Sequence, residues 1–334
     1  MSEQNGNGVP TPPDRRRKPS ASSAPHHPRQ RARHQRGKRS RHDDSAAGDD
    51  APGLGQGDQN PGQFNTPHNI AVDRQDQVYV ADRNNRRIQV FDAEGTFKRF
   101  IFLNATYDKT HHPVLGNLPA NPPDETQPWT LCITNGPTQY LYTSDQEPGR
   151  IYKMTLDGKI LGTMGISGRD VKQFNWIHAI ACPTDDTLYV ADMMADGVHV
   201  VDPETFKQYA FIPTGVGAHG LYPSRDGKLL YVANRGSNYV HGKPKGKGSV
   251  SVIDFATGKV LKTWPVPGGG SPDMGGVSAD GKHLWLSGRY DDVVYRFDTQ
   301  SGAVDFIAVG KQPHGLAVWP QPGRYNLGHT GNLR

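Results

Sequence analysis

The sequence predicts an all-β fold, a β-propeller of about six blades, and two observations carry this prediction. A phrase of four short strands recurs along residues 61–334, at spacings that approach the roughly 40 to 45 residues of one propeller blade. The chain also holds 39 glycines and 27 prolines in 334 residues, a level typical of many short strands joined by turns. This composition argues against a helical bundle.

The first copy of the phrase, residues 62–102, shows the four strands in order. The apolar inner strand PHNIAV comes first, and VYVAD, RIQVFD and FKRFIF follow it. Asp-Arg-Gln-Asp and Asp-Ala-Glu-Gly lie between strands, and these residues favour tight turns. We therefore expect one four-stranded blade from each copy.

Four further copies follow, and a sixth begins at PHGLAVWP and stops. The corresponding inner-strand positions are spaced by 61, 49, 41, 55 and 40 residues, and they are His68, Trp129, His178, His219, Met274 and His314. The long spacings place loops near residues 103–126 and 241–248. A candidate second strand of the last blade lies at 324–327. Two alternatives stay open: an irregular blade closes the ring, or an open sheet edge favours a homo-oligomer.

Residues 1–60 predict a disordered basic arm before the propeller. Residues 1–42 carry eleven basic side chains against Glu3 and Asp14, a local charge of +9, whereas the whole chain carries +5. The remainder is therefore about −4 (5 minus 9), so the basicity belongs to the arm. One alternative is that residues 15–41 bind nucleic acid or an anionic surface weakly, and the other is a solvated tail.

Two features of the sequence bear on the compartment. No apolar stretch approaches the roughly 18 residues of a transmembrane segment, and no apolar segment follows the basic N-terminus as in a signal peptide. We therefore expect a cytoplasmic chain. Cys132 and Cys182 lie in apolar, strand-like runs, where we expect buried free thiols.

The phrases also resemble known repeats. YVADRNNRRIQVFD is similar to NHL repeats, and YVANRGSNY with SVIDFATGKVLKTWPV is similar to the YVTN repeats of bacterial quinoprotein-like propellers. The resemblance divides the propeller into NHL-like repeats at 61–200 and YVTN-like repeats at 201–334, stacked in one ring. It implies a β-propeller and relatives that are often exported. It leaves the activity open, because propellers host many unrelated functions.

Histidines at four of the six inner-strand positions are the sharpest indication of a site. His68, His178, His219 and His314 occupy equivalent positions, and the inner strands of a propeller line its central channel. Neutral imidazoles at one level are suitable ligands for Zn²⁺ or another divalent metal. The alternative is that each histidine hydrogen-bonds the backbone where its strand begins.

Arginines form a second register. Arg83, Arg235 and Arg289 follow their inner-strand positions by 15, 16 and 15 residues. Beside a metal, their guanidinium groups would hold a small anionic or peptide-like ligand through paired hydrogen bonds. The alternative is that arginines in turns face water. Acidic residues at the strand ends are expected to bond turn amides as structural groups, and they are Asp82, Asp145 and Asp192.

This arrangement resembles peptidyl-α-hydroxyglycine α-amidating lyase, a six-bladed propeller with channel histidines on zinc and catalytic arginine and tyrosine residues. PHNIAVD followed by VYVADRNNRRIQVF matches the family's histidine at His68 and its arginine at Arg83, and Tyr290 has the repeat phase of its tyrosine. The resemblance implies a metal-dependent lyase with Arg83 and Tyr290 as catalytic candidates. The arginine register adds Arg235 and Arg289 as candidates that would hold the ligand or stabilise developing negative charge. The family draws its zinc histidines from alternate blades, whereas here they fall on blades 1, 3, 4 and 6.

Two functions from different classes therefore stay open. The first is a metal site in the channel that binds a small anionic or peptide-like ligand, with lyase or hydrolase chemistry. The second is a non-catalytic scaffold whose propeller face binds a protein partner. Metal that depends on the channel histidines favours the first, and partner binding that is indifferent to a chelator favours the second.

Overall fold

A computed structural model describes residues 60–107, 126–145, 149–168, 170, 173–238 and 247–319 of the chain. These residues form strands and turns, and the one helical element among them is a 3-10 turn, η1 (Arg83–Asn85). They contain five four-stranded sheets, each with its strands side by side in chain order. The all-β prediction is therefore confirmed, and the sheets are blades 1 to 5 of a propeller.

Blades 1 and 2 come from the first two copies of the phrase. Blade 1 contains β1 (Pro67–Val72), β2 (Val78–Asp82), β3 (Arg87–Phe91) and β4 (Phe97–Ile101). Blade 2 contains β5 (Pro128–Ile133), β6 (Leu141–Asp145), β7 (Ile151–Met154) and β8 (Ile160–Met164). A short parallel pair, β9 (Ile166–Ser167) and β10 (Gln173–Phe174), leads to the next blade.

Blades 3 to 5 repeat the same antiparallel meander. Blade 3 contains β11 (Ile177–Ala181), β12 (Leu188–Asp192), β13 (Gly197–Asp202) and β14 (Lys207–Pro213). Blade 4 contains β15 (Ala218–Pro223), β16 (Leu229–Asn234), β17 (Ser249–Asp254) and β18 (Lys259–Pro265). Blade 5 contains β19 (Pro272–Val277), β20 (His283–Gly288), β21 (Val293–Asp298) and β22 (Val304–Ala308).

The turn between β3 and β4 shows how the sequence shapes a blade. Gly95 has φ 84°, a backbone conformation that glycine adopts without steric cost. The Gly95 amide donates to the carbonyl of Asp92 at 3.0 Å, and the Thr96 amide donates to Asp92 Oδ1 at 2.7 Å. An aspartate and a glycine at fixed offsets therefore close this turn, as the sequence predicts.

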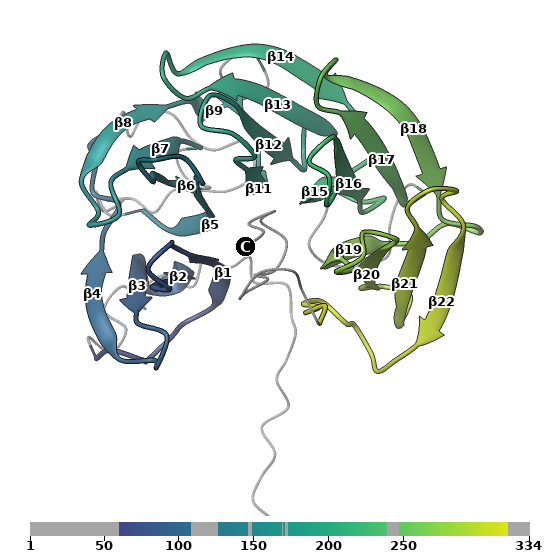
Figure 1. Ribbon diagram of the computed structural model, residues 1–334, viewed down its shortest axis with the longest axis horizontal. Helices are drawn as coiled ribbons and strands as arrows, with labels where there is room; N and C mark the ends of the chain where they lie inside the picture. The colour runs from purple at the N-terminus through teal and green to yellow at the C-terminus, as the bar shows by residue number, and fades with distance from the viewer. Residues whose placement is uncertain are drawn as a thin grey trace, which may run out of the picture. The chain divides into compact units, whose positions relative to one another are not determined.

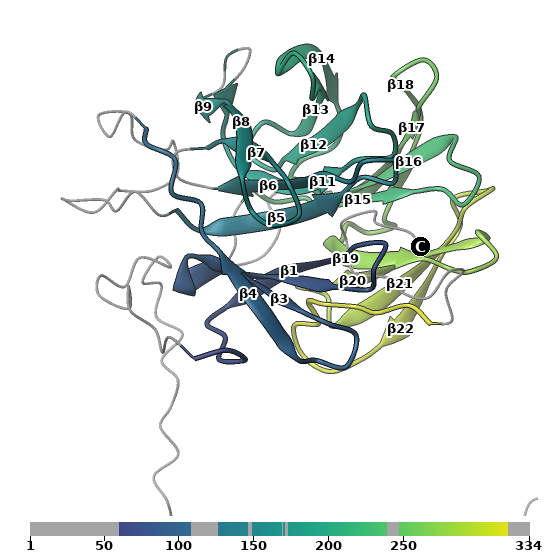
Figure 2. The ribbon, with the colours of Figure 1, turned by 60° about the vertical axis from the view of Figure 1, so that its left-hand side comes forward.

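The five blades follow one another around a common axis (Figure 1). Their inner strands pack in succession, β1 against β5, β5 against β11, β11 against β15 and β15 against β19. Figure 2 shows β5, β11 and β15, one from each of three successive blades, lying side by side. Neighbouring blades enclose a hydrophobic core, and the core between blades 4 and 5 includes Trp264, Leu286 and Phe297. The inner strands β5, β11 and β15 of the middle blades are therefore covered on both faces.

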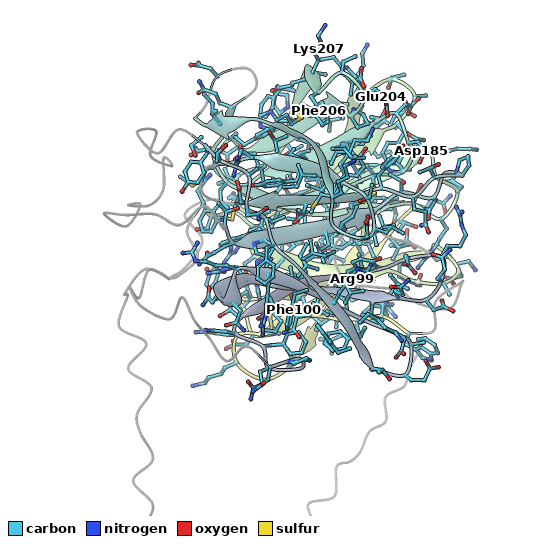
Figure 3. All side chains as sticks on the ribbon, turned by 90° about the vertical axis from the view of Figure 1, so that its left-hand side faces the viewer. Arg99, Phe100, Asp185, Glu204, Phe206 and Lys207 are labelled. Atoms are coloured by element: carbon cyan, nitrogen blue, oxygen red, sulfur yellow. A yellow bond between two sulfur atoms is a disulfide. The ribbon has the colours of Figure 1, made fainter. Side chains whose placement is uncertain are left out.

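The outer parts of neighbouring blades are also linked. Glu204, on the turn between β13 and β14, pairs with the buried Lys153 of blade 2, with 2.6 Å between Oε1 and Nζ. The ring of Phe206 on the same turn packs over Gly162, where a Cβ atom would approach the ring to 2.4 Å. Figure 3 shows Glu204 and Phe206 on this outer side. The close approach explains why a residue without a side chain stands at position 162.

A disulfide joins Cys132 in β5 to Cys182, which follows β11, so the expectation of free thiols is wrong. The two Cα atoms are 6.2 Å apart, although 50 residues separate the cysteines in sequence. The bond contributes about 4 kcal/mol to stability in a chain-entropy treatment of such a loop. Disulfides persist mainly in oxidising compartments, so this bond and the cytoplasmic expectation point in opposite directions.

The sixth blade is not confirmed by the described residues. Residues 309–319, which include the phrase PHGLAVW, form no strand. The candidate strand at 324–327, residues 1–59 of the predicted arm, and residues 108–125 and 239–246 of the two loops lie outside the described part of the chain. Within that part, no helix has the length and apolar character needed to cross a membrane.

Candidate metal centre

A break in strand pairing positions the side chains that meet near the axis. In every blade the pairing of the inner strand with its neighbour shifts at one place, and these shifts lie between Pro67/Asn69, Pro128/Leu131, Ile177/Ala179, Ala218/Gly220 and Pro272/Gly275. A β-bulge of this kind turns a side chain away from the regular alternation of the strand. The inner-strand residues that the sequence singles out lie at these bulges.

The shift corrects one assignment, because the equivalent residue of blade 5 is Asp273 and not Met274. In β19 the shift follows Pro272, which pairs with Gly288, just as Pro67 pairs with Asp82 in blade 1. The residue after the first paired position is therefore the equivalent one in both blades. A signal was present in the sequence, since PDMGG aligns with PHNI and PHGL when the proline is the reference.

These side chains contact one another in sequence around the axis. The rings of His68 and His178 have centroids 5.2 Å apart, and the rings of His178 and His219 stack at 3.6 Å. His219 Nδ1 lies 2.8 Å from Asp273 Oδ1, and His314 Nε2 lies 3.8 Å from Asp273 Oδ2. The structure thus places all four predicted histidines in one chain of contacts.

Two of those histidines form a compact cluster with Asp273. Ligand atoms of His219, Asp273 and His314 all lie within 4.8 Å of one another, and they form the one such group among the described residues. His68 and His178 lie beside this cluster and outside it. His68 Nδ1 donates instead to the carbonyl of Trp129 at 2.7 Å, so it links blades 1 and 2.

The carboxylate of Asp273 is the unusual member of this cluster. It is wholly buried, and in the described part of the chain neither of its oxygens accepts a hydrogen bond of acceptable geometry. Arg235 Nε lies 3.8 Å from Oδ2, so the nitrogens around the carboxylate approach it without aligned donor geometry. Buried carboxylates normally have hydrogen-bond partners, and an exception is explained by strain, a catalytic role, or a bound ion or water.

The spacing of the cluster fits a transition metal. Bonds of about 2.0–2.1 Å at tetrahedral angles place neighbouring ligand atoms about 3.3 Å apart. The nitrogen–oxygen distances are 2.8 Å to Oδ1 and 3.8 Å to Oδ2 of Asp273, and the ligand atoms spread over at most 4.8 Å, so binding one ion requires the side chains to close in by up to about an ångström. Imidazole and carboxylate groups are also common zinc ligands. The residues present therefore fit zinc or a similar ion.

The electrostatics favour the charge states that metal binding requires. Burial alone would raise the pKa of Asp273, but His219 and Arg235 lower it well below its ordinary value. Burial lowers the pKa of His219, and the charge of Asp273 opposes that effect. Partial burial lowers the pKa of His314 in the same way. At neutral pH the cluster therefore offers an ionised carboxylate and two neutral imidazoles.

The predicted arginines lie in two places. Arg235 Nη2 donates to the hydroxyl of Tyr290 at 2.7 Å, and the guanidinium carbons of Arg235 and Arg289 lie 5.3 and 5.8 Å from the centroid of the Tyr290 ring. Arg83 packs over the ring of Trp129 at 4.0 Å. Arg83 and Arg235 are buried, so the alternative that they face water is wrong. Arg235 connects the cluster to Tyr290, and Arg83 packs against the inner strand of blade 2.

The strand-end aspartates have the structural role that the sequence predicts. Asp82 Oδ1 accepts from the Asn65 amide at 2.7 Å, and Asp145 Oδ1 accepts from the Arg150 amide at 2.7 Å. Asp192 accepts hydrogen bonds from several backbone amides around it. These carboxylates hold turns, in contrast to Asp273.

A cavity of about 380 Å³ lies elsewhere on the protein, on blade 3 and the segment before it, and its lining includes His199, Phe211 and Asp170. The nearest carboxylate to His199 is Asp192, with 3.4 Å between Nε2 and Oδ2. Neither His199 nor Asp170 belongs to the cluster of candidate metal ligands found in the described residues. His199 and Asp192 therefore form a buried imidazole–carboxylate pair like that of His219 and Asp273, but without a third candidate ligand among the described residues.

The fold is that of a β-propeller, and one of its repeats matches the NHL repeat. The NHL repeat family matches residues 64–91, which lie in blade 1. The chain is 33% identical to antigen Lp49 of Leptospira interrogans over 165 residues, 46% of this chain and 34% of that protein. It is 29% identical to peptidyl-glycine alpha-amidating monooxygenase A of Xenopus laevis over 166 residues, 47% of this chain and 15% of that enzyme. The similarity thus spans a minor part of each relative's length.

Solved structures share the architecture. Hydrazine synthase of Kuenenia stuttgartiensis superimposes with a TM-score of 0.56 at 16% identity, over 78% of this chain and 70% of that chain. A streptogramin B lyase superimposes with a TM-score of 0.55 at 14% identity, over 78% of this chain and 74% of that chain. At these identities the likeness shows the fold alone.

Proposed function

We propose that the centre of the propeller binds a divalent transition metal, with zinc as the first candidate, through His219, Asp273 and His314. The observation that carries the proposal is the buried Asp273 carboxylate, which has two imidazoles and a guanidinium around it and no aligned hydrogen bond within the described residues. Three protein ligands leave a fourth position for water or a substrate, the arrangement of catalytic zinc sites. The cluster therefore suits a reactive centre better than a closed structural one.

We propose a small anionic or peptide-like ligand for this centre. The metal would supply Lewis-acid polarisation of a ligand oxygen. Arg235 and Arg289, which both lie beside the Tyr290 ring, would orient a carboxylate through charge-assisted hydrogen bonds. The Tyr290 hydroxyl, which accepts from Arg235 at 2.7 Å, would hold or transfer a proton at Oη.

The reaction class that we favour is that of a lyase. Support comes from the similarity to an amidating enzyme over 47% of this chain and from the shared fold of a streptogramin B lyase. The cluster of this chain uses an aspartate where the family resemblance implies a histidine. We also propose a six-bladed ring, in which residues 309–319 supply the inner segment of the last blade.

Metal retention by the full-length chain tests the proposed centre. After treatment with a chelator, loading with Zn²⁺ and dialysis, mass spectrometry should find about one zinc per wild-type chain. Asp273→Asn keeps the size of the side chain but removes its charge, so the variant should lose most of the metal. His219→Ala should do the same.

The matched control is His199→Ala, which removes a buried imidazole that faces a carboxylate but has no third ligand nearby. This variant should retain zinc as the wild type does. Wild-type protein without zinc, or zinc retained by Asp273→Asn, would show that the proposal is wrong. A propeller that binds no metal would be better described as a protein-interaction scaffold.

A further inference from the structure

The third ligand of the proposed centre is held differently from the other two. His219 and Asp273 are wholly buried in β15 and β19, whereas the side chain of His314 is 43% exposed. His314 lies in residues 309–319, which follow β22 and form no strand. One ligand therefore comes from a segment outside the five described blades.

Few described contacts hold this segment in place. The amides of Val309 and Gln312 donate to the carbonyl and to Oδ1 of Asp292, at 3.0 and 2.8 Å. Ser287 Oγ donates to the carbonyl of His314 at 2.7 Å. The segment has no fully buried side chain, and Trp319 is 77% exposed. Segments with so few buried apolar contacts open locally at low free energy.

The position of His314 gives a bound ion a second role. Because His314 Nε2 is 3.8 Å from Asp273 Oδ2, one ion can bond both residues and so join the segment to blade 5. His219 extends the same set of ligands to blade 4. We infer that metal binding acts as a latch that fixes residues 309–319 against blades 4 and 5. This inference rests on the proposed metal centre.

The latch predicts a quantitative relation between zinc affinity and exchange protection of the segment. If His314 binds the ion only when the segment is docked, metal and docking favour each other by the same factor. The loss of zinc affinity on removal of His314 should therefore match the gain in protection of the segment on zinc binding. Couplings of this kind are typically roughly 5- to 150-fold.

Hydrogen exchange of the full-length chain measures the latch directly. The chain is stripped with a chelator, and exchange is followed with and without saturating zinc chloride. Zinc should slow exchange in peptides that cover 309–319 and leave peptides from β6 unchanged. His314→Gln should bind zinc more weakly than the wild type. The fold-loss in zinc affinity should equal the fold-gain in exchange protection that zinc gives the wild-type segment. At saturating zinc the segment of His314→Gln should gain no protection.

The control variant is His283→Gln. It removes an imidazole from β20 of the same blade. His283 begins this strand, whereas Gly288, at the other end, pairs with Pro272 next to Asp273. The substitution therefore lies at the end of β20 that is away from the cluster. This variant should bind zinc and protect the segment as the wild type does. Zinc binding to the wild type without slower exchange of the segment would overturn the latch and leave the metal centre intact. Wild-type zinc affinity in His314→Gln would overturn the latch and would also remove His314 from the proposed set of ligands. Absence of zinc binding in the wild type would overturn both.

Discussion

Buried carboxylates near the ends of these strands have two different roles. The number of hydrogen-bond donors aligned with each carboxylate distinguishes the two roles. Asp192 accepts the backbone amides of Asn175 and Trp176 at 2.6 and 2.9 Å, and two further amides at 3.1 Å. Asp273 is equally buried, but in the described residues it accepts no aligned hydrogen bond. A saturated carboxylate holds a turn, whereas an unsaturated one is suited to an ion.

Asp192→Asn should lower the free energy of unfolding by about 1–3 kcal/mol at neutral pH, because it weakens these charge-assisted hydrogen bonds. Burial alone would raise the pKa of Asp192, but His199 and the amides of Asn175 and Trp176 lower it. For a lowered pKa, the stabilisation is complete above the unfolded value of about 3.9 and is lost as the pH falls through the folded value.

Urea unfolding of the wild type and of Asp192→Asn checks this prediction. The difference in free energy should be equal at about pH 7 and about pH 5, and it should shrink at about pH 3. A difference that grows on acidification would contradict the assigned role of the carboxylate.

The inner strands share an irregularity that positions the candidate site, and it recurs in every described blade. Each strand breaks its pairing at the residue that lies near the axis. The regular part of the strand packs against the neighbouring blades, whereas the bulge turns one side chain toward the candidate site. In β19 the bulge requires Gly275, because a Cβ atom there would lie 1.8 Å from the carbonyl oxygen of Trp285. The geometry of Asp273 therefore depends on a glycine two residues away.

Gly275→Ala should destabilise the protein by about 2 kcal/mol or more, because the new methyl group meets backbone that cannot move aside freely. It should also reduce zinc retention, since β19 carries Asp273. Gly310→Ala is the control, because nothing lies within 4 Å of a Cβ atom at that position. Equal urea midpoints for the two variants would argue against the tight bulge.

The sequence is informative about strands and less so about what lies between them. The recurring phrase predicts the four strands of blades 1 to 5, and the phase of the histidines predicts that they meet. Asp273 is missed when the inner-strand residue of blade 5 is placed at Met274, one residue after the position that Pro272 marks. The disulfide is missed because Cys132 and Cys182 are 50 residues apart and meet only when blades 2 and 3 pack together.

At the scale of the whole propeller, packing between blades decides which residues meet. The candidate centre joins β15 of blade 4, β19 of blade 5 and the segment after β22, so no single repeat contains it. Four hydrophobic cores between neighbouring blades fix the inner strands that carry His219 and Asp273. The candidate centre therefore depends on the packed blades rather than on any one repeat.

X-ray absorption at the zinc edge of the loaded full-length chain tests this account most directly, because it reports which kinds of atoms surround the ion. The account predicts two imidazoles and a carboxylate oxygen, from His219, His314 and Asp273, with a non-protein ligand in the remaining position. Asp273→Asn should remove that signal. A centre of three or four imidazoles that includes His68 or His178, or no ordered zinc at all, would contradict the account.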